Sequence, residues 1–212
     1  MKFADMYAWW NQAALDNPLT AILSNEVHWD HNRFFETGNV WLAEHRAFAA
    51  AAGVTMLGRH ALDFGCGVGR MTAALAEYYG DVVGIDISDE MVRLAGRLRP
   101  RANTRFIQVM EPPLPFADQE FDCVYSTIVL QHIPFPHNLQ YLSEFFRISC
   151  DLVLTDAPSH ALKGKSPGPG IFLLDLRYTL SCAQHNGFDL IALREFPATS
   201  TRQYQYLFRR IA

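Results

Sequence analysis

The feature that most constrains the fold is a glycine-rich turn at residues 63–70, which read Asp-Phe-Gly-Cys-Gly-Val-Gly-Arg. An apolar run, Ala61–Phe64, leads into this turn, and a helical segment starts at Gly69. Glycines at such a position let the backbone bend tightly and let a ligand approach the bare main chain. The pattern predicts a strand, a turn and a helix, with a ligand site at the turn.

From His60 onward, short apolar runs alternate with helical segments. Strands are expected at 61–64, 82–85, 105–109, 121–126 and 152–155, and helices from Gly69, Ser88, His137 and Leu173. This alternation predicts an α/β fold, a doubly wound parallel sheet with helices on both faces. The last two runs, Phe188–Arg194 and Tyr204–Ile211, follow each other without a helix, so an antiparallel hairpin is expected there.

Residues 1–58 are helical in character. The run Val40–Ala52 consists of good helix formers, and Gly53 is its expected C-cap. A chain of 212 residues suits one domain, so we expect residues 1–212 to form a single domain, with a helical cap at 1–58 and a core at 59–212. The Gly/Pro-rich stretch Ala157–Gly170 is too long for an ordinary connection and is a candidate lid.

Composition excludes several classes of protein. The formal net charge of −4, from 18 Lys and Arg against 22 Asp and Glu, gives no support for tracking a nucleic-acid backbone. Apolar runs are interrupted well before the ~18 residues that cross a bilayer, and the start Met1–Asp5 lacks a secretory signal. The four cysteines have no metal-ligand spacing. We therefore expect a cytoplasmic protein without nucleic-acid or membrane partners and without a metal site.

A second ligand signal stands at Asp86, seventeen residues beyond Gly69, where the expected second strand ends. A carboxylate at the end of this strand can accept hydrogen bonds from two ribose hydroxyls, although an acid there can also simply end a strand. The glycine spacing is G-x-G-x-G, whereas nicotinamide and flavin sites read G-x-G-x-x-G/A. The position that such sites need small is occupied by Arg70, which argues against a nicotinamide reductase.

These residues resemble the class I S-adenosylmethionine-dependent methyltransferases of the small-molecule type. The resemblance rests on the glycine turn, Asp86, the segment Leu114–Ser126 and the segment Val129–Ile133. Pieces near Asn17 and Phe34 resemble the N-terminal helical cap of a bacterial subgroup. The resemblance implies a three-layer sandwich whose seven-stranded, mostly parallel sheet has the order 3-2-1-4-5-7-6 and an antiparallel last strand. It also implies S-adenosylmethionine (SAM) as the cofactor.

The resemblance further implies roles for individual residues. Asp63 would accept from the ammonium of the cofactor, Asp86 would hold the ribose, and Ile87 would pack on adenine. Met110 and Glu111 follow the third strand, where many relatives place an acid that binds the adenine amino group. The remaining cofactor contacts expected from the main chain or side chains are Gly65, Cys66, Gly67, Met91 and Ser126. Arg33 lies in a stretch too polar and irregular for a core, and it is a candidate for binding the cofactor carboxylate or the substrate.

Methyl transfer to a weak nucleophile needs a group that removes a proton. His132, after the fourth strand, is the first candidate, because an imidazole has an ordinary pKa of ~6.5. Asp156 and His160 are rivals, and His132 can also hydrogen-bond the cofactor or simply pack. The expected function is methyl transfer to an O or N atom of a small molecule by a monomer or homodimer. A catalytically silent binding module is the alternative.

Overall fold

The computed structural model describes residues 2–161, 172, 174–197 and 201–211. The chain divides into two compact units, residues 1–111 and 112–212. Among the described residues, none of the helices combines the length and the apolarity that crossing a membrane requires. The expected division into a cap at 1–58 and a core at 59–212 stays a prediction.

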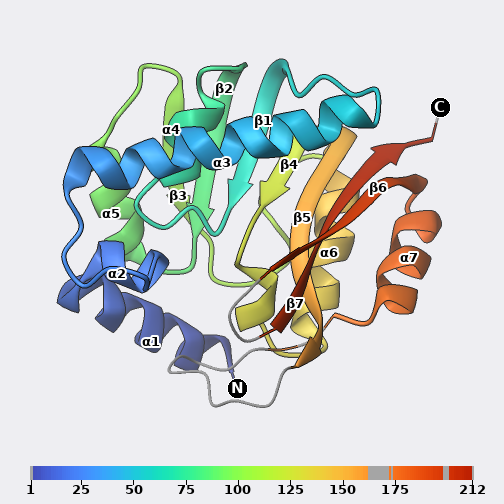
Figure 1. Cartoon of the computed structure of the whole chain (residues 1–212). Helices are drawn as coiled ribbons and strands as arrows, with labels where there is room; N and C mark the ends of the chain where they lie inside the picture. The colour runs from blue at the N-terminus through green and yellow to red at the C-terminus, as the bar shows by residue number, and fades with distance from the viewer. Residues whose placement is uncertain (1, 162–171, 173, 198–200, 212) are drawn as a thin grey trace. The chain divides into compact units, whose positions relative to one another are not determined.

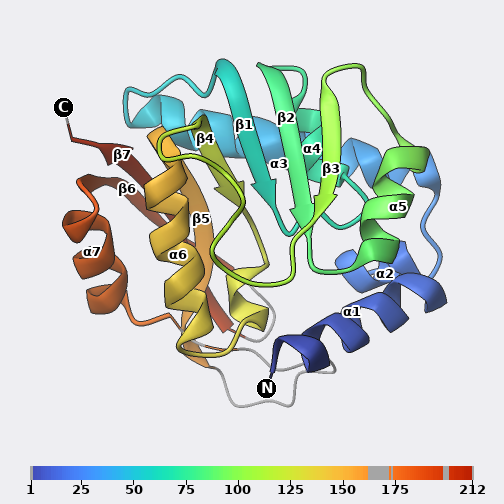
Figure 2. The ribbon, with the colours of Figure 1, turned by 180° about the vertical axis from the view of Figure 1, so that it is seen from behind.

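The first unit contains five helices and three strands. In chain order they are α1 (Phe3–Asp16), α2 (Pro18–Ile22), α3 (His31–Ala51), β1 (Gly58–Phe64), α4 (Arg70–Leu75), β2 (Tyr79–Asp86), α5 (Asp89–Leu98) and β3 (Thr104–Gln108). Helix α3 crosses in front of the strands in Figure 1 and behind them in Figure 2, so it covers one face of β1–β3. The expected helix starts are close: Gly69 and Ser88 are the N-caps of α4 and α5.

Close packing of α3 on α4 depends on Gly38. A Cβ atom at this position would lie 2.6 Å from the carbonyl oxygen of Arg70. The buried Arg70 guanidinium lies 4.6 Å from the centre of the Trp41 ring on the same long helix. Arg70 therefore packs the helices of this unit together.

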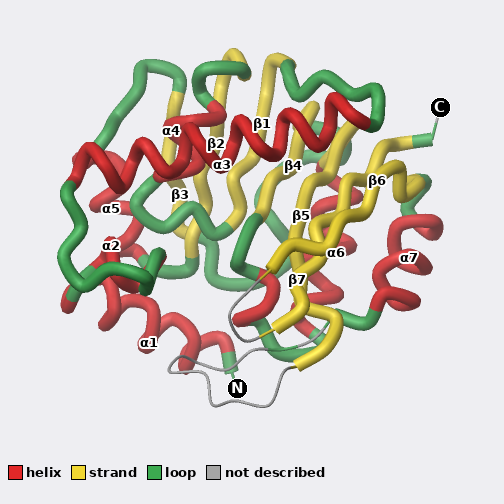
Figure 3. Tube along the Cα trace, in the orientation of Figure 1, coloured by secondary structure: helices red, strands yellow, loops and turns green. Residues whose placement is uncertain are grey.

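The described residues of the second unit form four strands and three helical segments. They are β4 (Phe121–Ser126), the 3₁₀ helix η1 (Leu130–His132), α6 (His137–Ile148), β5 (Ser149–Ala161), α7 (Leu176–His185), β6 (Phe188–Pro197) and β7 (Thr201–Arg210). Helix α6 lies behind β5 in Figure 1 and in front of it in Figure 2, so it covers one face of that strand. Figure 3 shows the long, paired strands of this unit as yellow tubes.

The strand order β3-β2-β1-β4-β5-β7-β6 confirms the expected seven-stranded sheet. Strands β1, β2 and β3 pair in parallel, as do β4 and β5. Strand β7 runs antiparallel to both β5 and β6, as expected for the final hairpin.

Two boundaries differ from the sequence prediction. Strand β5 continues to Ala161 because β7 pairs with it along that length, so residues 157–161 of the predicted lid are strand; residues 162–170 lie outside the described residues. Helix α7 begins at Leu176, not at Leu173, because the Asp175 side chain accepts from the Arg177 N–H and caps the helix there.

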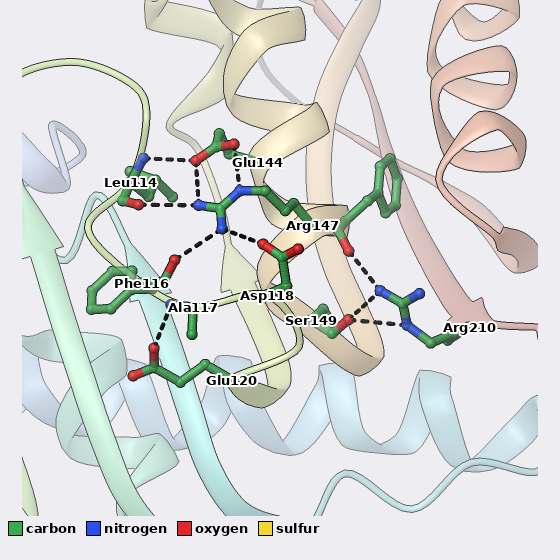
Figure 4. Close-up of polar contacts among 10 residues, drawn as sticks. Leu114, Phe116, Ala117, Asp118, Glu120, Glu144, Arg147, Ser149 and Arg210 are labelled. Carbon is green, nitrogen blue, oxygen red and sulfur yellow. Dashed lines mark hydrogen bonds and ion pairs between the residues drawn. The ribbon is translucent and has the colours of Figure 1, made fainter.

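Arg147 holds the loop that leads into β4 (Figure 4). Its guanidinium donates to the carbonyl oxygens of Leu114 and Phe116, at 3.0 and 2.9 Å, and to the carboxylates of Glu144 and Asp118. The Glu144 carboxylate also accepts from the Leu114 N–H at 2.7 Å. These contacts attach residues 114–118, the first part of the motif Leu114–Ser126, to α6 just before β4. The first part of this motif therefore has a structural role.

Candidate functional site

The glycine turn between β1 and α4 is built on three left-handed residues. The φ angles are 73° at Gly65, 52° at Gly67 and 82° at Gly69, in a region that residues with a Cβ atom rarely adopt. The N–H groups of Gly65 and Cys66 both donate to the Ile85 carbonyl oxygen, at 2.8 and 2.9 Å. The turn after β1 is thereby fixed to the end of β2.

The next N–H, that of Gly67, donates to Asp86 Oδ2 at 2.9 Å. Consecutive N–H groups of this turn, at residues 65, 66 and 67, are thus all used inside the protein. Phosphate-binding loops instead aim their N–H groups at the anion. With these three N–H groups engaged inside the protein, the turn is poorly suited to a pyrophosphate.

Asp86 ends β2 in a fixed orientation. Oδ2 accepts from Gly67, and Oδ1 accepts from the Ser88 N–H, also at 2.9 Å. Burial raises the pKa of this half-buried carboxyl, while the two N–H donors lower it; the net direction is upward. Each carboxylate oxygen has a second lone pair, so the anchored group can still accept from a pair of hydroxyls.

Asp63, the last but one residue of β1, is 3% exposed. Thr72 Oγ1 donates to its Oδ2 at 2.6 Å. Burial raises the pKa of Asp63 to about 6, although Thr72 and the charge of Arg70 act in the opposite direction. A cationic ligand group beside this carboxyl would favour its ionised form.

The N-terminal helices reach the same part of the first unit. Asn11 Oδ1, on α1, accepts from Ser88 Oγ at 2.6 Å and from the Glu90 N–H at 3.1 Å. On α2, Ile22 Cδ1 lies 2.6 Å from the position a Cβ atom would take at Gly67. Sequence reasoning missed Asn11 and Ile22, because neither residue stands in a motif; only the fold brings them to the glycine turn.

The other cofactor residues expected in this unit have varied surroundings. Cys66 and Met91 are buried, and Met91 belongs to an apolar cluster with Phe34 and Phe35. Ile87 is half-buried, whereas Met110 and Glu111 are exposed. Arg33 is largely exposed, forms an ion pair with Glu26 at 2.7 Å and lies over the Trp29 ring.

In the second unit, Ser126 is the last residue of β4, and His132 ends η1 six residues further along the chain. Ser126 is buried, and its Oγ has no hydrogen-bond partner in the part of the chain that the structure describes. His132 is half-buried on η1, with its Nε2 3.1 Å from Gln131 Nε2. The Gln131 Oε1 atom accepts from the Gln203 side chain on β7.

Asp156 on β5 is 2% exposed, and its Oδ1 accepts from the Ile128 N–H at 2.6 Å. Burial raises the pKa of Asp156 to about 7, against the smaller effect of that N–H. The side chain of His160 lies outside the described residues. Across residues 2–161, 172, 174–197 and 201–211, no group of three or more His, Cys, Asp or Glu side chains is arranged to hold a metal.

Comparison with known proteins finds similarity to methyltransferases. A model described as a methyltransferase domain matches residues 62–151. An O-methyltransferase of Penicillium expansum is 36% identical over 108 residues, which are 48% of this chain and 39% of the relative. A ubiquinone biosynthesis O-methyltransferase of Coxiella burnetii is 26% identical over 141 residues, 65% of this chain and 52% of the relative. The chain thus spans between two-fifths and about half of these curated relatives.

Among solved structures, a magnesium protoporphyrin IX methyltransferase of Synechocystis PCC 6803 with bound SAH is similar. The TM-score is 0.72 at 18% identity, and the match covers 98% of this chain and 99% of that one. At this identity, the likeness shows the fold. The matched family segment begins at Leu62 and contains both the glycine turn and Asp86.

Proposed function

We propose that the chain, whose residues 62–151 match a methyltransferase-domain model, is a class I SAM-dependent methyltransferase and that it transfers a methyl group from SAM to an O or N atom of a small-molecule acceptor. The observation that carries the proposal is the hydrogen bond between the Gly67 N–H and the Asp86 carboxylate. This bond removes the last of three consecutive N–H groups from the turn and orients the acid at the same time.

The residues of the turn fit this cofactor chemically. SAM, when bound, supplies a methyl group on a positively charged sulfur. Asp63 and the carbonyl oxygens of the turn would take the ammonium of its amino-acid part, since both are acceptors. Asp86, oriented from both sides by main-chain donors, would take the ribose hydroxyls. Ile87 and Met110 would contact the adenine, and Glu111 would accept from its amino group.

Other expected contacts have less support from their surroundings. Arg33 would have to exchange Glu26 for the cofactor carboxylate, and Met91 would act through its place in the apolar cluster behind the turn. Gly65 and Cys66 would contribute main-chain atoms, and the Ser126 hydroxyl stays a predicted cofactor contact.

His132 would hold the proton that the acceptor loses. An amide NH₂ group can only donate, so the Gln131 contact assigns Nε2 as an acceptor with the ring proton on Nδ1, and Nε2 would take up a proton once Gln131 releases it. Gln203 fixes the Gln131 amide from the other side. Nε2 of His132 is therefore the first candidate for the base.

A calorimetric titration with S-adenosylhomocysteine (SAH), the product form of the cofactor, tests the proposal. We expect saturable binding by the wild-type protein and at least a tenfold loss for Asp86→Ala, about 1.4 kcal/mol. Asp81→Ala is the matched control, because this acid is exposed on the same strand and pairs only weakly with His60, at 4.0 Å. Absence of heat with the wild type, or equal affinities for both variants, contradicts the proposal.

A small molecule as the acceptor follows from the same premise and from the charge of −4. A monomer or homodimer, a cytoplasmic location and the lack of nucleic-acid partners stay predictions. Methylation assays of His132→Gln test the base: we expect SAH binding to persist while turnover falls on the order of 10²-fold.

A further inference from the structure

A row of three polar side chains crosses the antiparallel strands of the second unit. Asp156 on β5 pairs in register with Gln205 on β7, and Gln205 pairs with Arg194 on β6. Directly opposite residues of antiparallel strands have their side chains on the same face, with Cβ atoms about 4.5–5.5 Å apart. A carboxyl, an amide and a guanidinium are therefore neighbours on one face of these strands.

The amide of Gln205 is fully buried and fixed at one end only. Its Oε1 accepts from Arg194 Nε at 2.8 Å, which turns the NH₂ group away from the guanidinium. Within the described part of the chain, Gln205 Nε2 has no hydrogen-bond partner, although its side chain is 0% exposed. Burying such a donor without a partner opposes folding, so native structures rarely keep one without a reason.

The neighbouring Asp156 is held at one oxygen by a strained residue. The Ile128 N–H that donates to Oδ1 belongs to a β-branched residue with a φ angle of 60°. Strain of this kind persists where the surrounding structure enforces it and is concentrated at functional sites. Asp156 and Gln205 lie beside each other but do not bond, because Gln205 Nε2 is the unpaired atom.

Residues 128–132, which include the proposed base His132, are hydrogen-bonded to β5 and β7. Ile128 bonds to Asp156, and three residues later the Gln131 side chain bonds to Gln203, which stands two residues from Gln205 on β7 and so shares its face. The Phe172 N–H donates to the Gln131 carbonyl oxygen at 2.7 Å. His132 is thereby held within the same unit as the carboxyl and the amide.

We propose that Asp156 and Gln205 bind the acceptor molecule through two adjacent oxygen atoms. One is a hydroxyl that donates to the Asp156 carboxyl, and the other is a hydroxyl or carbonyl oxygen that accepts from the Gln205 NH₂ group. The acceptor class is thus a vicinal diol, a catechol or a hydroxy-carbonyl compound. This inference rests on the proposed function, since it names the substrate class of the methyl transfer.

The donor and acceptor pattern excludes simpler occupants. A lone amine satisfies Asp156 but offers no acceptor to Gln205. A lone carboxylate or phosphate accepts from Gln205, but it can bond to Asp156 only while that acid is protonated, so it is released as the pH rises above the Asp156 pKa of about 7. An ordered water satisfies both groups, so it is the outcome against which the proposal is tested.

The binding experiment uses catechol as the probe and its dimethyl ether, veratrole, as the probe that cannot donate a hydrogen. Ligand-observed NMR is recorded on the full chain for the wild type, Asp156→Asn and Gln205→Met. We expect millimolar catechol to bind the wild type, at least tenfold weaker binding by each variant, and at least tenfold weaker binding of veratrole. No binding of catechol, or equal binding by wild type and variants, overturns the proposal in favour of a water-filled site.

A stability measurement uses a matched pair of glutamines on β7. Gln205→Met removes the unpaired Nε2 donor together with the bond from Arg194 to Oε1, but the half-buried Arg194 side chain can turn to water, so the melting temperature of the ligand-free protein is expected to change by less than about 2 °C. Gln203→Met removes the donor of the buried Gln131 amide and is expected to lower the melting temperature. Equal losses for both variants assign Gln205 a structural role and overturn the proposal.

SAH titrations of the same samples distinguish a failure of the proposed function from a failure of the inference about the acceptor. Asp156→Asn and Gln205→Met are expected to bind SAH as tightly as the wild type. If the wild type binds catechol but not SAH, the proposed function is wrong, whereas the assignment of Asp156 and Gln205 as an oxygen-binding site stands. A wild type that binds SAH but not catechol removes only the inference about the acceptor.

Discussion

The Gly67 N–H donates to Asp86 Oδ2 at 2.9 Å, a hydrogen bond between residues that stand 19 positions apart. Strands β1 and β2 are in parallel register up to the pair Phe64 and Ile85, so the segments that follow the two strands leave the sheet side by side. The bond turns two separate sequence signals, a glycine turn and a strand-end acid, into a single fixed unit.

Gly67→Ala is expected to destabilise the protein for two separable reasons. Its φ angle of 52° is strained for alanine, and the new Cβ atom would lie 2.6 Å from Ile22 Cδ1. Gly53→Ala is the matched control, because its φ angle is 75° but nothing lies within 4 Å of the Cβ position. Urea unfolding is expected to show losses of about 1–2 kcal/mol for Gly53→Ala and about 2–4 kcal/mol for Gly67→Ala.

The double variant Gly67→Ala with Ile22→Ala resolves the two causes. Shortening Ile22 removes the steric conflict but not the strain at φ, so the two changes are expected to cost less together than their separate losses predict. Strict additivity would show that α2 does not lie on the glycine turn in solution.

The pKa of about 6 at Asp63 predicts a pH-dependent cofactor affinity. Below pH 6 the apo carboxyl is protonated and must lose its proton before it can bind an ammonium. SAH affinity is therefore expected to be level between pH 7 and 8 and to fall about tenfold by pH 5, as measured by calorimetry. Asp63→Asn, which cannot ionise, is expected to bind weakly without this pH dependence; a wild-type affinity that is unchanged at pH 5 contradicts the assignment.

Asp156 predicts a pH effect on the stability of the ligand-free protein. Burial raises its pKa to about 7, above the value of an exposed aspartate. The neutral acid is thus favoured in the folded state, and its contribution to stability is lost as the pH rises through 7. Chemical denaturation at pH 6 and pH 8 is expected to give Asp156→Asn a relative gain at pH 8 of about 1 kcal/mol, since the stability of the wild type falls with pH only up to about pH 7. A variant that follows the wild-type pH profile would rule out this buried titration.

Asn11 on α1 is expected to fix the N-terminal helix to α5. Asn11→Ala removes the acceptor of Ser88 Oγ and of the Glu90 N–H, and we expect a loss of about 1–2 kcal/mol in the free energy of unfolding. The neighbouring Gln12→Ala is the control, because Gln12 bonds only to Asp16 on the same exposed helix face. Equal effects of both substitutions would argue against the docked position of α1.

Local patterns predicted much of the fold because strand and helix periods, caps and glycines act over a few residues. Ser88 illustrates this: it precedes a helical segment in the sequence, and its hydroxyl accepts from the Met91 N–H in the structure. The length of β5 was not predictable in the same way. Its residues 157–161 contain no strong strand signal, and they are strand because β7 pairs with them.

The residues of the candidate site fall into the same two groups, those that stand in a local sequence motif and those that only the fold brings together. Asp63, Asp86 and the glycines were identified because they stand in one motif. Asn11 and Gln205 were not, since an amide in a helix or a strand has no distinctive sequence context, and its function depends on what the fold places opposite. The register that sets Gln205 beside Asp156 is a property of the folded strands.

The central claim is that the glycine turn and Asp86 together bind the cofactor, and an NMR titration tests it most directly. SAH is added to ¹⁵N-labelled protein while the backbone amide signals are followed. The account predicts saturable shifts at Gly65, Gly67, Gly69 and Asp86, all with one dissociation constant. Saturable shifts confined to other residues, or no shifts at any concentration of SAH, would contradict it.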